Sequence, residues 1–112
     1  MTALKARTGR VNLTNVATLQ NRKDAVMRFH RAYKETVDWM YSDPAALKHF
    51  ADFANLPEKV VARVRELLPK AALNPDQVVG MDRIIAEAQA QKFIASPLTA
   101  AQVAELIQIP KP

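Results

Sequence analysis

One stretch, residues 22–54, constrains the fold most, because two helical patterns meet in it at a proline. In its first part apolar side chains recur at intervals of three and four residues, the period of one helix face. The members of this face are Val26, Phe29, Tyr33, Val37 and Met40. The residue before a proline avoids the helical conformation and proline fits a first helical turn, so Asp43-Pro44 ends one helix and begins the next. The pattern predicts helices over 22–41 and 44–54, with Asp43 as the N-cap of the second.

Three further helical patterns follow, and each begins at a proline or at a capping signal. They cover residues 57–68, 75–93 and 100–107. Asn55 tolerates the left-handed conformation that closes a helix, and Asn74 and Thr99 each stand three residues before a glutamine, as in a capping box. Gly80 inside the second pattern costs up to about 1 kcal/mol relative to alanine. We therefore expect a mainly α fold of about five helices, with residues 22–109 as one helical domain.

The two ends of the chain have other patterns. We expect residues 1–21 to be a partly ordered basic lead-in, because most of it lacks a helical period. Within it, residues 11–14 alternate apolar and polar side chains, which is typical of a short strand. A lone strand leaves backbone groups unpaired on both edges, and this chain offers it no obvious partner strand. Thr18 or Asn21 is the expected cap of the long helix, and residues 110–112 form a tail.

Length and composition exclude several classes of protein. With 112 residues, the chain is a single domain or a piece of one. It contains no cysteine, so it has neither a disulfide framework nor a thiolate metal site. No run approaches 18 apolar residues, so we expect no membrane span. The first ten residues lack an apolar core, so we expect no secretory signal in this chain.

The net charge of +5 is unevenly distributed along the chain. Residues 1–34 contain eight lysines and arginines against Asp24 alone, whereas the remainder contains eight against ten acidic residues. A basic N-terminal third is one feature of proteins that bind nucleic acid or another anionic surface. A solvated helix face is the favoured alternative, because Glu35 and Asp38 interrupt the basic residues. Nucleic acid is therefore not the expected partner.

No self-contained catalytic set is visible in the sequence. His30 and His49 are the only histidines, and neither has a second ligand one helical turn away, so surface or packed positions are favoured over a metal site. Ser42 and Ser96 both precede or cap a proline break, where a capping role is favoured over that of a nucleophile. The chain has two glycines and no glycine-rich phosphate loop. We predict no enzyme activity, no cofactor and no metal site.

Several motifs follow one another in an order that suggests a family. The long helix carries a basic residue, a phenylalanine and an Ala-Tyr pair, the Asp43-Pro44 break follows, and residues 93–99 read FIASPLT. The segments RKDAVMRFHRAYKETVDWMYSDPAALKHFADFANLPEKV, LLPKAALNPDQVVGMDRIIAEA and KFIASPLTAAQVAELIQ resemble the C-terminal part of type II periplasmic substrate-binding proteins of ABC importers. Within that family they are similar to proteins for sulfonates, taurine, nitrate and thiamine-pyrimidine precursors. The matching residues of the long helix are Arg28, Phe29, Ala32 and Tyr33.

The resemblance implies a fold and a function. Members of the family have two α/β lobes around a cleft, and this chain would be the helical layer that closes the fold. It implies solute binding and delivery in a periplasmic parent protein, with a small organic or oxyanion solute and an importer permease as partners. Asn12, Thr14 and Asn15 are the residues that we expect at the rim of the cleft, and we expect no ligand binding by this chain alone. Its apolar faces would then be covered by self-association, as a dimer or a higher oligomer.

An independent helical interaction module is the alternative to this reading. Such a module would use the basic N-terminal third to bind nucleic acid, and its binding would weaken steeply with salt because counterions are released.

Overall fold

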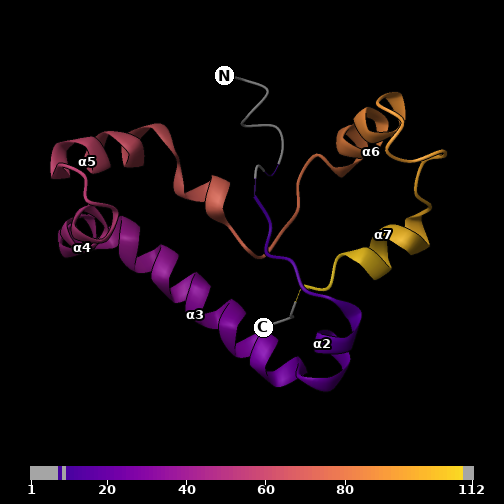
Figure 1. Cartoon of the computed structure of the whole chain (residues 1–112), viewed down its shortest axis with the longest axis horizontal. Helices are drawn as coiled ribbons and strands as arrows, with labels where there is room; N and C mark the ends of the chain where they lie inside the picture. Colours follow the sequence, from indigo (N-terminus) through magenta and orange to yellow (C-terminus); the bar gives the residue numbers. More distant parts are fainter. Residues whose placement is uncertain (1–7, 9, 110–112) are drawn as a thin grey trace. The chain divides into compact units, whose positions relative to one another are not determined.

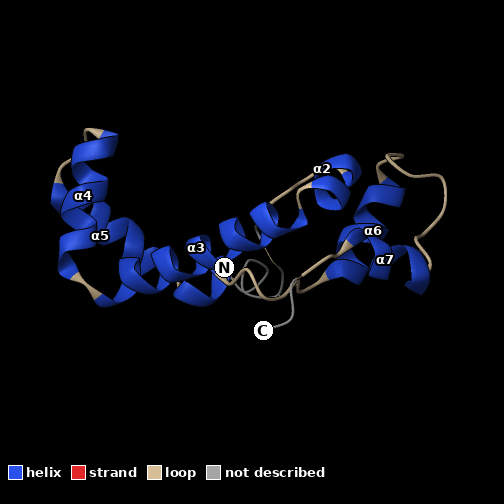
Figure 2. Ribbon diagram, turned by 90° about the horizontal axis from the view of Figure 1, so that it is seen from below, coloured by secondary structure: helices blue, strands red, loops and turns tan. Residues whose placement is uncertain are grey.

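The structure is a computed structural model that describes residue 8 and residues 10–109. These residues form six α-helices and one short 3₁₀-helix, and they contain no β-strand, so the mainly α fold class is confirmed (Figures 1 and 2). The elements are α2 (Val16–Asn21), α3 (Lys23–Ser42), α4 (Pro44–Ala54), α5 (Glu58–Leu67), η1 (Lys70–Leu73), α6 (Met81–Ala90) and α7 (Ala100–Leu106). None of the described helices combines the length and the apolar character needed to cross a membrane.

The described residues divide into two compact units, where the sequence predicts one helical domain over 22–109. Residues 12–75 make up the first, which we call the α2–α5 unit. The second, the α6–α7 unit, combines residues 76–109 with Thr8, Arg10 and Val11.

The α2–α5 unit is built along α3. Helix α4 packs on α3 and on α5, and η1 contacts α3 as well. Figure 1 shows α4 and α5 gathered near the C-terminal end of α3. The buried apolar side chains are Val37, Ala46, Ala51 and Val61, contributed by these three helices. Since two of the four are alanines and the other two are valines, their burial removes little apolar surface from water.

The predicted caps place most helix ends of this unit. Asp43 accepts a hydrogen bond from the backbone N–H of Ala45 at 2.9 Å, and Pro44 occupies the first turn of α4, as predicted. Asn55 has a left-handed backbone with φ 53° and closes α4, because the N–H of Leu56 then reaches the carbonyl of Ala51. Helices α3, α4 and α5 therefore agree with the predicted ranges to within one residue at each end.

The N-terminal segment differs from the prediction. Residues 11–14 form no strand, because no other described segment pairs with them. The predicted connector contains helix α2, whose N-cap Asn15 accepts from the N–H of Thr18 at 2.7 Å. Neither Thr18 nor Asn21 caps α3; its N-cap position is Arg22, which makes no capping side-chain bond. The prediction therefore missed one helix cap, Asn15, and the helix α2 that it begins.

In the α6–α7 unit the predicted helix 75–93 is shorter than expected. Gly80 has φ 79°, a left-handed conformation that interrupts the predicted helix, so α6 begins at Met81. Val79, the residue before Gly80, instead pairs with Thr8. The Val79 N–H donates to Thr8 Oγ1 at 2.7 Å, and the Val79 carbonyl accepts from the Thr8 N–H at 2.8 Å. No helix begins at Asn74, which instead ends η1, whereas the box formed by Thr99 and Gln102 is present and begins α7.

Helix α6 ends in a turn that the sequence does not predict. Lys92 has φ 63°, which costs about 1–2 kcal/mol for a residue with a Cβ. This conformation lets the N–H of Phe93 reach the carbonyl of Ala88 and the N–H of Lys92 reach that of Gln89, both free helix-end acceptors. The hydrogen bonds therefore offset an unfavourable backbone conformation at Lys92.

Asn55 offers a direct test of the left-handed cap. We expect Asn55→Ala to lower the free energy of unfolding of the α2–α5 unit by about 1 kcal/mol, because alanine tolerates this conformation less well. Asn55→Gly is the matched control and should leave stability unchanged or slightly raised. Urea unfolding followed by Trp39 fluorescence measures both. Equal stability of the alanine and glycine variants would contradict the assigned cap.

Candidate functional site

The residues that the sequence predicts at a ligand site, Asn12, Thr14 and Asn15, lie close together in the sequence. All three are exposed, so they form no enclosed site. Asn12 and Thr14 are exposed in the irregular segment before α2. Asn15 is also exposed, and its side-chain oxygen is already engaged with the N–H of Thr18. Of the three, Asn15 therefore has a structural role, as the N-cap of α2. The role of all three in ligand binding stays a prediction.

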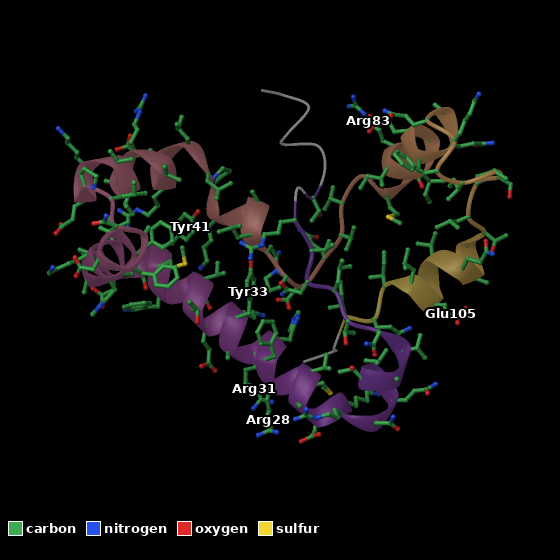
Figure 3. The ribbon with its side chains drawn as sticks, in the orientation of Figure 1. Arg28, Arg31, Tyr33, Tyr41, Arg83 and Glu105 are labelled. Carbon is green, nitrogen blue, oxygen red and sulfur yellow. The ribbon has the colours of Figure 1, made fainter. Side chains whose placement is uncertain are left out.

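The basic residues of α3 do not form an unbroken cationic surface. Figure 3 shows Arg28 and Arg31 projecting from the same side of the helix. Arg28 Nη2 lies 3.3 Å from the carboxylate of Asp24 one turn earlier. Glu35 follows Arg31 by four residues on the same face. Because acids alternate with the arginines, this face resembles a solvated helix surface more than a track for phosphates.

The histidines lie apart from each other in the sequence, and one has an aromatic neighbour. The His49 ring lies 5.7 Å from the Trp39 ring, centroid to centroid, with 41° between the ring planes. Trp39 Nε1 also donates to Asp43 Oδ2 at 3.0 Å, while the other oxygen of Asp43 caps α4. One carboxylate therefore connects the indole to the start of the next helix. Within the described residues, no three His, Asp or Glu side chains are grouped so that they could hold a metal ion.

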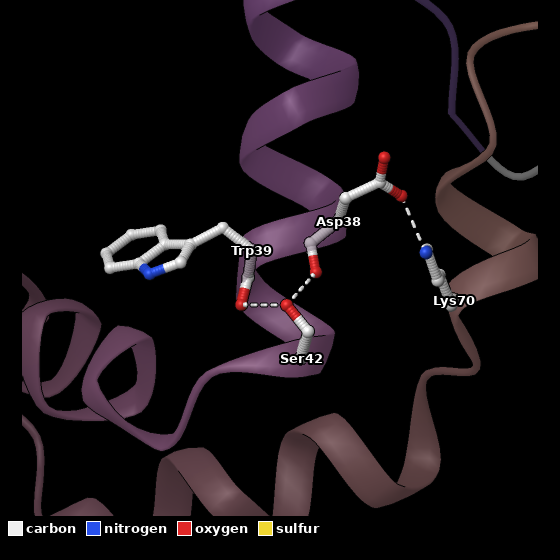
Figure 4. A network of polar contacts seen from close by, with 4 residues as sticks. All are labelled: Asp38, Trp39, Ser42 and Lys70. Atoms are coloured by element: carbon white, nitrogen blue, oxygen red, sulfur yellow. Dashed lines mark hydrogen bonds and ion pairs between the residues drawn. The ribbon is translucent and has the colours of Figure 1, made fainter.

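Ser42 is engaged within α3. Its hydroxyl donates to the carbonyl of Asp38 at 2.8 Å and lies 3.4 Å from that of Trp39 (Figure 4). Both acceptors belong to the last turns of the helix, and the Trp39 carbonyl also accepts from the backbone N–H of Asp43 at 3.0 Å. The hydroxyl therefore adds a further donor near the end of α3, and the described residues place no histidine against it.

The densest set of long-range polar contacts joins the C-terminal ends of α3 and α5. Tyr41 of α3 donates its hydroxyl hydrogen to the carbonyl of Leu68, the C-cap residue of α5. Arg65 of α5 donates in return to the carbonyl of Met40 at 3.4 Å, in the last turn of α3. Each helix end therefore receives a donor from the other helix. We call these two bonds the reciprocal caps.

An ion pair extends the reciprocal caps toward η1. Lys70 Nζ lies 2.6 Å from Asp38 Oδ1, across the contact between η1 and α3 (Figure 4). Both side chains are about half exposed, so this pair alone contributes only about 0–1 kcal/mol. The main effect of this ion pair is therefore to position η1 on α3, and its effect on the free energy of unfolding is small.

Burial at the reciprocal caps changes the acidity of one group. Partial desolvation raises the pKa of the Tyr41 phenol above its usual value, and the nearby positive charge of Arg65 opposes this effect. The neutral phenol is therefore the form that the folded unit prefers, and it is also the form that donates to Leu68.

Comparison with protein-family models, with curated proteins and with solved structures gives no match for this chain. The described residues offer capping bonds, surface ion pairs and exposed apolar side chains.

Sequence reasoning missed Tyr41, Arg65 and Lys70. Tyr41 lies beside the predicted apolar stripe of α3, and Arg65 lies in the last turn of α5, where a cation suits the helix dipole. The position of Arg65 in the last turn was the one signal in the sequence for these contacts. It indicates that Arg65 lies near a helix C-terminus, but it does not reveal that Arg65 donates to the carbonyl of Met40 on a different helix.

Removing the Tyr41 hydroxyl should lower stability. We expect Tyr41→Phe to reduce the free energy of unfolding by about 1 kcal/mol at pH 7, because the Leu68 carbonyl loses its donor. Since the raised pKa favours the neutral phenol in the folded unit, this contribution is present below the ordinary pKa of 10.0 and is lost as pH rises through the folded-state value. Urea titrations at pH 7 to 11 measure the difference between the two proteins. That difference should shrink above pH 10, and parallel pH profiles would contradict the assignment.

Proposed function

We propose that this chain is the C-terminal helical portion of the substrate-binding protein of an ABC importer. Its parent binds a small organic or oxyanion solute in the periplasm and delivers it to the permease. The chain supplies a helical layer to that protein and performs no catalysis. The observation that carries the proposal is the amount of apolar surface that the α2–α5 unit leaves in water.

The exposed apolar residues are large, and they lie on helix faces. Phe29 belongs to the predicted inward stripe of α3, yet 61% of it is exposed, and Phe53 near the end of α4 is 88% exposed. Burying a side chain of this size contributes about 1.5–3 kcal/mol, so a fold that leaves several in water forgoes a large share of its stability. Isolated exposed apolar residues are common, but here they lie on three helices, and on α4 and α5 they recur at helical spacing. The members are Phe29, Trp39, Phe50, Phe53, Val60, Val64 and Leu67, with Leu56 between α4 and α5.

Such faces are expected of helices that cover another layer of a larger protein. A helix that covers a sheet has one apolar stripe, and that stripe is exposed when the sheet is absent. The order of motifs in residues 22–107 supports the same reading, since their resemblance is to helices that close the second lobe of a two-lobed receptor. Asn12, Thr14 and Asn15 remain the residues proposed for the cleft rim.

The proposal also has a consequence for the chain in isolation. Without the remainder of a lobe to cover them, these faces are covered most readily by other copies of the chain. We therefore propose that the isolated chain self-associates and binds none of the parent's solutes.

The size and location of the native protein test this proposal. An antibody raised against the chain should detect, in the periplasmic fraction of the cells that carry the gene, a polypeptide well above the 12.5 kDa of the chain itself. The purified chain, loaded alongside, is the size control. A native product of 12.5 kDa confined to the cytoplasm would overturn the proposal.

Solute binding separates the larger protein from its helical portion. Calorimetry of the chain with nitrate, taurine or an alkyl sulfonate should show no binding heat, whereas the larger protein purified with the same antibody should bind one solute of this class. Tight binding by the chain alone would contradict the proposed role, because a solute held between two lobes needs residues from both.

A further inference from the structure

Helix α5 carries a narrow apolar row on its solvent side. Val60, Val64 and Leu67 recur at intervals of four and three residues and are 40%, 48% and 59% exposed. Val61, about 100° around the helix axis from Val60, is buried, and α5 packs on α4. The row therefore lies beside the buried face of α5 and remains exposed itself.

A charged row runs beside the apolar row, one residue earlier at each position. Its members are Lys59, Arg63 and Glu66, all exposed. Arg63 Nη1 lies 2.9 Å from Glu66 Oε2, so these two side chains form an ion pair along the row. Lys59 stands at the N-terminal end of the row and Glu66 at the other, which makes the two ends opposite in charge.

We propose that the α5 face binds a second copy of the chain, with the two α5 helices antiparallel about a two-fold axis. In a two-fold interface the same patch serves both partners, so a residue near one end of the row meets one near the other end. Val60 then packs against Leu67 of the second copy, and the two Val64 side chains meet near the axis. This inference deepens, and rests on, the self-association proposed above.

The charges favour this occupant over others. In an antiparallel pair, the charged row faces the same row of the second copy in reverse order. Lys59 then lies opposite Glu66 of the second copy, and by symmetry Glu66 lies opposite Lys59 of the second copy. Each Arg63 lies near the axis but remains paired with its own Glu66. Nucleic acid would need cations without interleaved acids and would leave the valines and Leu67 in water. The row is therefore complementary to itself.

The size of the contact bounds its strength. A specific stable interface buries about 1,200–2,000 Å² in total, and one ten-residue helix face supplies only part of that area. We therefore expect a reversible dimer whose population rises with protein concentration, with helix α5 at its centre.

Charge exchange tests the orientation. Sedimentation velocity of the full chain over a hundredfold range of concentration should show the wild type dimerising. Lys59→Glu and Glu66→Lys should each weaken the dimer about tenfold, because two symmetry-related attractions become repulsions. The double variant carrying both changes should restore it, since opposite charges then meet again in exchanged positions. Val64→Glu should abolish the dimer, because it places two carboxylates near the axis.

The matched control lies near the start of α3, whereas α5 lies near the other end of that helix (Figure 1). Arg28 Nη2 and Asp24 Oδ2 form an exposed ion pair at 3.3 Å there, so the variant exchanging these two charges should dimerise as the wild type does. Circular dichroism of every variant should show unchanged helix content, which distinguishes a lost interface from a lost fold.

Each remaining outcome overturns a defined part of the inference. A wild-type chain that stays monomeric overturns both the α5 interface and the self-association on which it rests. A dimer that is insensitive to Val64→Glu and to the charge exchanges overturns the α5 interface and leaves self-association standing. Neither result bears on the size of the native protein, so the proposed parent is tested separately.

Discussion

The α2–α5 unit depends on how two helix ends satisfy each other's carbonyl groups. A helix leaves its last four carbonyls without intrahelical donors. Helices α3 and α5 both end within residues 12–75, so both leave such carbonyls in this unit. Tyr41 and Arg65 exchange donors between these ends, and Ser42 supplies a third donor within α3. These directional bonds set the relative placement of α3 and α5. The four buried apolar side chains, two alanines and two valines, would define that placement less sharply.

This division of labour explains the character of the surface. Polar groups near the helix ends position the elements, so the apolar faces are only partly used inside the unit. Phe29 and the Val60–Val64–Leu67 row remain in water even though their spacing is that of core residues. A domain that completed its own core would reverse this pattern, burying the aromatic side chains and leaving the polar contacts to solvent. The α2–α5 unit therefore has the properties of a layer more than those of an independent globule.

Sequence reasoning succeeded where a cap and a proline act within a few residues of each other. Asp43-Pro44, Asn55 and the Thr99–Gln102 box determine helix ends through local bonds, so their effect can be read from local sequence. It failed at Gly80, where the left-handed backbone and the pairing of Val79 with Thr8 outweighed a good capping signal at Asn74. The reciprocal caps were beyond its reach for a different reason. Tyr41 and Leu68 are separated by 27 residues, and nothing local links a phenol to a distant carbonyl.

The local caps also bear on the order in which this protein assembles. Because α4, α2 and α7 each carry a capping side chain of their own, their nuclei need no distant partner, and such contacts close quickly. The reciprocal caps can form only after the α4–α5 connection has brought two helix ends together. Helix α5 has no capping side chain at its N-terminus and is held by its contacts with α4 and by the reciprocal caps. In the folded unit α5 is already helical, so whatever covers its apolar row is spared the entropic cost of ordering that backbone.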